Sequence, residues 1–155
     1  LLFGPIHYKR AQAWKTDSNL FATAAQDMPN SSFAWHYHGY VLMGEGHYND
    51  AAKAFLLAVE TGHPHPDDRL NRLIALTLAN KPKEALFWAE NGPKENLSAL
   101  HLSWWGRAAV EAGEHELAIQ LFAPLHGPKG FDGPDWVDAY WNKAIGDKKT
   151  KTELE

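Results

Sequence analysis

A repeat of about 34 residues is the feature of this sequence that most restricts its fold. Equivalent alanines stand at Ala51, Ala85 and Ala118, spaced by 34 and then 33 residues. Gly39 and Gly106 keep the same register, because each precedes its alanine by twelve residues. A fixed period of this length is typical of helical repeat proteins, in which each unit buries its apolar face against the next. The sequence therefore predicts a chain of stacked units.

Each unit contains two segments with helical periodicity. Apolar residues recur at spacings of three and four, and glycine, asparagine or proline separates the segments. In the middle unit, Leu73 and Asn80 stand where the other units have glycine, so that copy is degenerate. We predict an all-α protein with helices at 35–43, 48–61, 69–79, 82–91, 96–112, 115–125 and 134–145.

Small residues are expected where paired helices cross. Two helices approach closely only where the crossing point has no bulky side chain. Glycine within a helix costs about 0.5–1 kcal/mol relative to alanine, so its return at one repeat position indicates a packing role. We expect Gly39 to face Ala51 and Gly106 to face Ala118. The large side chains around these crossings are Trp35, Phe55, Trp105 and Phe122.

The residues shared between units follow a characteristic order. One unit has Trp35, Gly39, Tyr48, Ala51, Phe55, Ala58 and, one place late, Pro64. A later unit has Leu102, Gly106, Ala118 and Phe122, with His115 at the aromatic position, and an incomplete copy upstream has Phe21, Ala24 and Pro29. This order resembles the tetratricopeptide repeat (TPR) family. The resemblance implies a right-handed superhelical α-solenoid of helix-turn-helix repeats that serves as a protein-binding scaffold.

The repeat register divides the chain. We predict a partial N-terminal repeat at 1–31, a full repeat at 32–65, a degenerate repeat at 66–98, a full repeat at 99–132 and a capping helix at 133–146. The last helix has an apolar face suited to covering the preceding repeat, as terminal units require; a truncated repeat is the alternative. The tail at 147–155 is polar, and its final Leu154-Glu155 is interpreted as a cloning remnant.

A narrower resemblance concerns the beginning of the chain. Trp14 followed by Leu20-Phe21, and then Pro29-Asn30-Ser31, resembles the junction between the multi-pass region and the TPR tail of membrane glycosyltransferase-like proteins. The chain also begins without Met, at Leu1-Leu2-Phe3, which indicates a piece of a longer protein. This resemblance implies an extracytoplasmic domain that selects the acceptor for such an enzyme. A cytoplasmic adaptor is the other interpretation.

Composition excludes several classes of function. The absence of Cys excludes thiol nucleophiles and Cys-based zinc sites. A formal charge of −4 without a basic block argues against nucleic acid as a partner. No apolar run approaches the roughly 18 residues that a membrane span needs, so the domain is not expected to span a membrane, although its parent can be membrane-anchored.

The TPR resemblance implies where a ligand binds. In that family the first helix of each pair lines the concave groove. The positions that match are Phe33, His36, Tyr37, Tyr40 and Met43, then Leu70, Asn71, Ile74 and Thr77, then Ser103, Trp104, Arg107 and Val110. Of these, Phe33, His36, Tyr37, Tyr40, Asn71, Ile74, Trp104 and Arg107 form the predicted site for a peptide or protein segment. Burial of these aromatics as core is the competing interpretation, and self-association through a repeat face is a further one.

Catalytic and metal-binding patterns are weak. His36 and His38 fall on opposite faces of a helix, and His63 with His65 supplies two loop ligands without a third. The acids Asp67 and Asp68 are expected to be solvated charges or caps at the start of a helix. The glycine-rich segment 127–134 contains two prolines and is interpreted as a loop. We predict a non-catalytic domain without a metal or cofactor.

Overall fold

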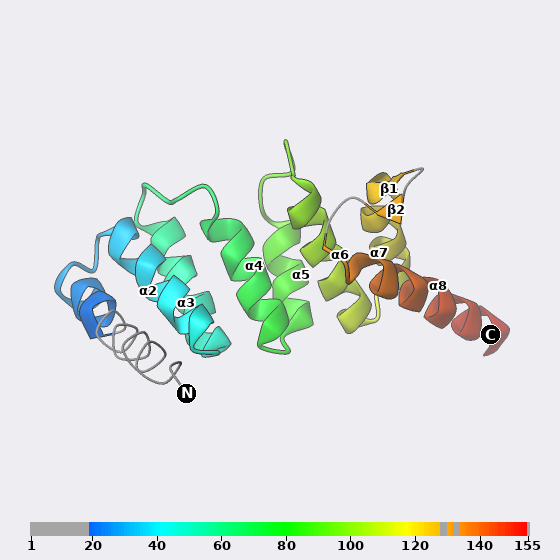
Figure 1. Ribbon diagram of the computed structural model, residues 1–155, viewed down its shortest axis with the longest axis horizontal. Coiled ribbons are helices and arrows are strands. Elements are labelled where there is room, and N and C mark those ends of the chain that lie inside the picture. Colours follow the sequence, from blue (N-terminus) through cyan, green and yellow to red (C-terminus); the bar gives the residue numbers. More distant parts are fainter. Residues whose placement is uncertain (1–18, 128–129, 132–133, 155) are drawn as a thin grey trace, which may run out of the picture. The chain divides into compact units, whose positions relative to one another are not determined.

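The computed structural model describes residues 19–127, 130–131 and 134–154, and most of them are helical (Figure 1). This confirms the prediction of an all-α protein. Residues 1–18, which include Trp14 and Leu1-Leu2-Phe3, and residue Glu155 lie outside the described part. The helices are residues 19–27, α2 (Ser32–Gly44), α3 (Tyr48–Glu60), α4 (Asp68–Leu78), α5 (Pro82–Glu90), α6 (Ala99–Ala112), α7 (His115–Phe122), the 3₁₀ turn η1 (Ala123–Leu125) and α8 (Val137–Leu154).

Side-chain caps set the beginnings of two helices. The hydroxyl of Ser31 accepts the Ala34 amide hydrogen before α2, and the hydroxyl of Ser98 accepts the His101 amide hydrogen before α6. These caps satisfy amide groups that the first turn of a helix leaves unpaired. For this reason α2 begins at Ser32, three residues before the predicted start, and α6 begins at Ala99, three residues after it.

The turn within each unit recurs at the predicted repeat spacing. Gly46 and Gly113 adopt positive φ angles of 79° and 85° at equivalent places. Asn80, which replaces glycine in the degenerate unit, has a φ of 58°. Asparagine is among the few side-chain-bearing residues that enter this left-handed region readily. The degenerate copy therefore keeps the same turn with a different residue.

The C-terminal segment differs from the prediction. Helix α8 continues to Leu154, whereas we expected a helix that ends near residue 145 and a polar tail. The tail is rich in lysine and glutamate, which are good helix formers. Lys148 also pairs with Glu116 of α7, with 2.7 Å between Nζ and Oε1. The segment predicted as a loop contains two short antiparallel strands, β1 (His126–Gly127) and β2 (Gly130–Phe131), in which His126 pairs with Phe131.

The chain divides into two compact units between Ala75 and Leu76, within α4. In the first unit α2 packs against α3, and the buried residues of α3 are mainly alanines together with Phe55. The beginning of α4 joins this hairpin, because the Arg72 guanidinium donates a hydrogen bond to the carbonyl oxygen of Ala52. In the second unit α6 packs against α5 and α7, and α8 packs against both α6 and α7.

A glycine lies against a phenylalanine ring in each unit. A Cβ atom added to Gly39 would lie 2.7 Å from Phe55, and one added to Gly106 would lie 2.6 Å from Phe122. Both rings are fully buried. The close contact that requires glycine is therefore with the phenylalanine, whereas the sequence had suggested Ala51 and Ala118 as the partners. These alanines are themselves fully buried.

The two tryptophans assigned to the core behave differently. Trp105 is buried, as predicted. Trp35 is only half-buried, and its indole N–H donates to the Pro29 carbonyl oxygen at 2.9 Å. Trp35 therefore holds the segment that leads into α2 instead of filling the interior.

Gly39→Ala should lower the free energy of unfolding by about 1–2 kcal/mol. Overpacking a buried ring costs about 1–3 kcal/mol, which exceeds the gain of up to about 1 kcal/mol from better helix propensity. Gly146→Ala is the matched control, because Gly146 lies in α8 with open space around the added Cβ. Urea unfolding followed by circular dichroism should show a loss for Gly39→Ala and a gain or no change for Gly146→Ala. Equal effects would contradict the proposed packing role.

Candidate functional site

An aromatic stripe runs along the outer face of α2. Phe33, Tyr37 and Tyr40 are spaced by four and three residues, so they lie on one face of the helix. Their exposed fractions are 64%, 38% and 43%. All three were predicted to be groove residues, and the first unit exposes them together. We call Phe33, Tyr37 and Tyr40 the α2 stripe.

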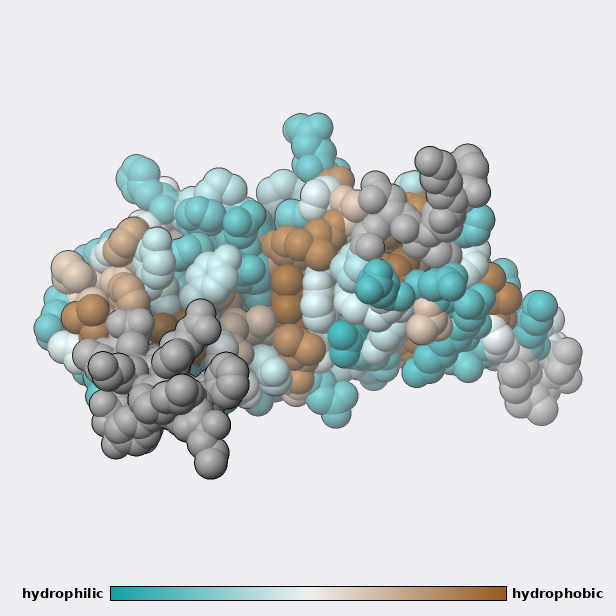
Figure 2. Space-filling model, viewed as in Figure 1, coloured by the Kyte–Doolittle hydropathy of each residue, from teal (hydrophilic) through white to brown (hydrophobic). Residues whose placement is uncertain are grey.

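Neighbouring rings hold the stripe in place. Phe21 stacks on Tyr37 with 5.1 Å between ring centroids, and the rings of Phe33 and Tyr37 lie 4.5 Å apart. Tyr40 contacts Phe55 edge to face at 5.8 Å. Figure 2 shows apolar side chains gathered over residues 19–27 and the beginning of α2, where Leu20 and Phe33 are more than half exposed. The stripe is thus part of a broader apolar surface.

A buried pair of hydrogen-bonded side chains lies beneath the stripe. Nδ1 of His36 is 2.6 Å from Oδ1 of Asp68, and both side chains are buried. The second oxygen of Asp68 accepts the His65 amide hydrogen at 2.8 Å. A buried carboxylate is stable only when donors of this kind surround it. Asp68 therefore joins three segments: α2, the loop between α3 and α4, and the first turn of α4.

The pair of His36 and Asp68 borders a cavity of about 300 Å³. It is lined by Ser32, Phe33, His36 and Tyr37 from α2 and by His63, Pro64, His65 and Pro66 from the loop. The hydroxyl of Ser32 donates to the His63 carbonyl oxygen at 2.6 Å, which fixes the loop against the helix. The ring of His65 lies 4.4 Å from that of His36. The cavity walls are aromatic rings, prolines and imidazoles.

The sequence prediction was wrong about Asp68. It was expected to be a solvated charge or a helix cap, but it has no exposed surface and bonds the His36 ring, whereas the neighbouring Asp67 is exposed as expected. His36 was predicted to line a groove; it is 6% exposed and lines the cavity from below. The repeat pattern contains no signal for this pair, because the position of Asp68 is not among the shared residues.

A second cluster forms in the other unit around Arg107. Its Nε donates to Oε1 of Glu111 at 2.8 Å, and the Tyr140 hydroxyl donates to the same oxygen at 2.9 Å. The guanidinium carbon lies 5.0 Å, 5.6 Å and 5.1 Å from the ring centroids of Trp104, Trp136 and Tyr140. These are cation–π distances, and they bring α8 onto α6.

Trp104 and Arg107 were predicted to receive a ligand, but they already have partners within the chain. Trp104 contacts Trp136 edge to face at 5.1 Å, and Arg107 pairs with a carboxylate of its own helix. Burial raises the pKa of the Tyr140 phenol, and its hydrogen bond to Glu111 raises it further. The ring contacts and the hydrogen bond from Tyr140 to Glu111 therefore tie α8 to α6.

The remaining predicted groove residues are buried to different degrees. Asn71, Ile74 and Met43 are half-buried, and the buried side-chain nitrogen of Asn71 has no hydrogen-bond partner among the residues that the structure describes. The structure buries four others, which therefore belong to the core: Leu70, Thr77, Ser103 and Val110.

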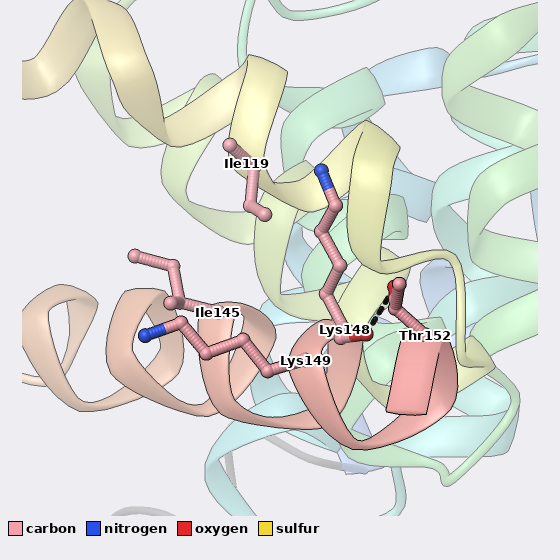
Figure 3. A pocket seen from close by; sticks show the side chains of 5 residues that line it. All are labelled: Ile119, Ile145, Lys148, Lys149 and Thr152. Carbon is pink, nitrogen blue, oxygen red and sulfur yellow. Dashed lines mark hydrogen bonds between the residues drawn. The ribbon is translucent and has the colours of Figure 1, made fainter. Parts of the chain in front are cut away.

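A larger pocket of about 430 Å³ lies between α7 and α8 (Figure 3). Ile119 and Ile145 form its apolar part, and Lys148, Lys149 and Thr152 complete the lining. The two lysine side chains point in different directions in Figure 3, and Lys148 pairs with Glu116. The two ammonium groups therefore do not converge on one anion.

Histidines do not assemble a metal site in the described part of the chain. Within it, no group of three or more His, Asp or Glu side chains is arranged to hold a metal ion. The same residues include no helix that is both long enough and apolar enough to cross a membrane.

Comparison of the chain with family models, with curated proteins and with solved structures finds no match in any of the three.

Asp68→Ala should destabilise the protein by about 3–5 kcal/mol. It removes the acceptor for His36 and for the His65 amide, and breaking a buried pair leaves the other partner uncompensated. Asp67→Ala is the matched control at an exposed carboxylate, with an expected loss below about 1 kcal/mol. Chemical denaturation of both variants provides the test. Similar losses would contradict the structural role of Asp68.

His38 should make the protein less stable in acid. Burial lowers the pKa of His38 below its ordinary value of 6.5, against the opposing charges of Glu45 and Asp50. The unfolded chain therefore binds this proton more tightly, and the contribution of neutral His38 to stability is lost as the pH falls from 6.5 through the folded-state pKa. Unfolding free energies measured across this range should fall less steeply in His38→Gln than in the wild type. Parallel pH profiles would show that burial of His38 has no such effect.

Proposed function

We propose that the chain is a non-catalytic TPR scaffold that binds a peptide or protein segment along the α2 stripe. The repeat register, the shared left-handed turns and the glycine–phenylalanine contacts support membership of the TPR class. In that class the first helix of each pair faces the concave side of a right-handed superhelix, and α2 is such a helix. The observation that carries the proposal is the exposure of three adjacent aromatic rings on one helix face.

The chemistry of the stripe suits peptide binding. Tyrosine and phenylalanine provide large contact areas at a small cost in conformational entropy, and the tyrosine hydroxyl adds a polar edge. Exposed aromatic clusters of this kind usually mark interaction sites. Asn71 and Ile74 of α4 belong to the same unit and extend the proposed contact beyond α2.

In the second unit, the helix equivalent to α2 does not offer a free aromatic surface. Trp104 and Arg107 of α6 occupy positions that correspond to Tyr37 and Tyr40 of α2, but they are engaged by Trp136 and Tyr140. A ligand would have to displace these contacts to reach α6. We therefore assign the initial binding of the ligand to the α2 stripe.

The hydrogen bonds of His36, Asp68 and Ser32 also favour a binding role over catalysis. The His36–Asp68 pair resembles two members of a hydrolytic triad, but a triad requires a nucleophile bonded to the histidine. The serine in the cavity lining, Ser32, donates its hydrogen to the His63 carbonyl oxygen instead. This arrangement favours a structural role for the pair over catalysis.

Selection from a random peptide display library tests the proposal. The wild-type chain should retain specific peptides, and the variant Tyr37→Ala/Tyr40→Ala should lose them by at least about tenfold, since interface aromatics commonly contribute 1–2 kcal/mol or more each.

Phe87→Ala is the control, because Phe87 is a 69% exposed aromatic in the second unit. This variant should keep the selected peptides. Circular dichroism must show that each variant is folded. Equal retention by the stripe variant and the wild type would place the binding surface elsewhere and overturn the proposal.

A further inference from the structure

The cavity beside the α2 stripe is lined by one imidazole that has a ring nitrogen available for a ligand. His36 lines the cavity, and its Nδ1 is already bonded to Asp68. Nε2, on the other side of the ring, forms no hydrogen bond with the residues that the structure describes. A largely buried imidazole that lines a cavity and has one ring nitrogen open to a partner is a feature that a ligand can satisfy.

Asp68 determines what kind of partner this nitrogen needs. An ionised carboxylate only accepts hydrogen bonds, so the hydrogen of the 2.6 Å contact belongs to Nδ1. The His65 amide donates to the other carboxylate oxygen, which is consistent with the ionised form. In a neutral imidazole whose Nδ1 carries the hydrogen, Nε2 is an acceptor. The ligand must therefore present a hydrogen-bond donor.

The cavity walls restrict the rest of the ligand. Phe33 and Tyr37 form one side, and Pro64 and Pro66 lie in the loop on the other. None of the eight lining residues is Asp, Glu, Lys or Arg, so the walls have no permanently charged side chain. A volume of about 300 Å³ lies at the lower end of the range for small-ligand sites, which suits a single side chain.

We propose that this cavity receives the indole ring of a tryptophan in the bound peptide, with the indole N–H donating to Nε2 of His36. An indole is a flat apolar ring with one donor and no acceptor, so it satisfies Nε2 without needing a donor from the walls. It also stacks favourably on aromatic neighbours. This inference rests on the proposed function, because it names the anchor of the segment that the α2 stripe binds.

Two matched peptides test the inference on the wild-type chain. One has a single tryptophan flanked by glycines, and the other has 1-methyltryptophan, which keeps the ring but lacks the N–H. Binding is followed by NMR shifts of the ¹⁵N-labelled chain, because the seven tryptophans of the chain obscure a fluorescence signal. The tryptophan peptide should shift the amides of Tyr37 and His65 and bind about tenfold more tightly than the methylated one.

Two variants locate the effect. Tyr37→Ala removes a wall of the cavity and should weaken both peptides. His36→Phe/Asp68→Asn replaces both members of the buried pair and should bind the two peptides equally, since the acceptor is gone. If this double variant does not fold, the comparison of the two peptides on the wild type still decides the matter.

The other outcomes separate this inference from the proposed function. Equal affinity of the two peptides for the wild type, or shifts confined to other surfaces, would overturn the indole site. Binding of free indole without binding of the tryptophan peptide would also overturn it, because the occupant would then be a small molecule. If display selection yields peptides that depend on Tyr37 and Tyr40 but contain no tryptophan, the proposed function stands and the indole anchor fails.

Discussion

The buried pair of His36 and Asp68 is the interaction on which the arrangement of the candidate site depends. Removing a carboxylate from water costs several kcal/mol, and the fold recovers this only if donors surround the charge. Here the donors come from two segments: the ring of His36 on α2 and the amide of His65 in the loop before α4. Their positions are therefore linked. The cavity exists because the loop is held at a fixed distance from the helix.

The exposed stripe and one member of the buried pair, His36, belong to the same helix, α2. His36 lies on the same side of α2 as the stripe, but its ring is turned inward to bond Asp68 of α4, whereas Phe33 and Tyr37 are exposed. The inward residue fixes α2 against α4 and the loop, while the outward residues remain open. The corresponding stripe on α6 is closed by Trp136 and Tyr140, with Arg107 held among their rings. Two helices with the same place in the repeat thus have different uses: one offers an aromatic surface and the other anchors α8.

The repeat pattern predicted most of the helices to within a few residues. It succeeded because it reports constraints that recur in each unit, such as the left-handed turn at Gly46 and Gly113 and the glycine packed against a phenylalanine. It also predicted the exposed aromatics of α2. It did not predict the burial of Asp68, because this contact occurs once and joins residues 32 positions apart. The sequence prediction missed the extension of α8 to Leu154. The residues of this extension are mostly polar helix formers, so they show no apolar periodicity from which a helix could be recognised.

The protonation pattern of His36 provides the most direct test of this account. Two-bond ¹H–¹⁵N correlation spectra of the imidazoles distinguish a hydrogen on Nδ1 from one on Nε2. The account predicts that neutral His36 carries its hydrogen on Nδ1, and that this hydrogen resonates at low field because of the short contact with Asp68. In Asp67→Asn the signal should persist, since that carboxylate is exposed. A neutral His36 with its hydrogen on Nε2 would contradict both the buried pair as described and the acceptor that it presents to the cavity.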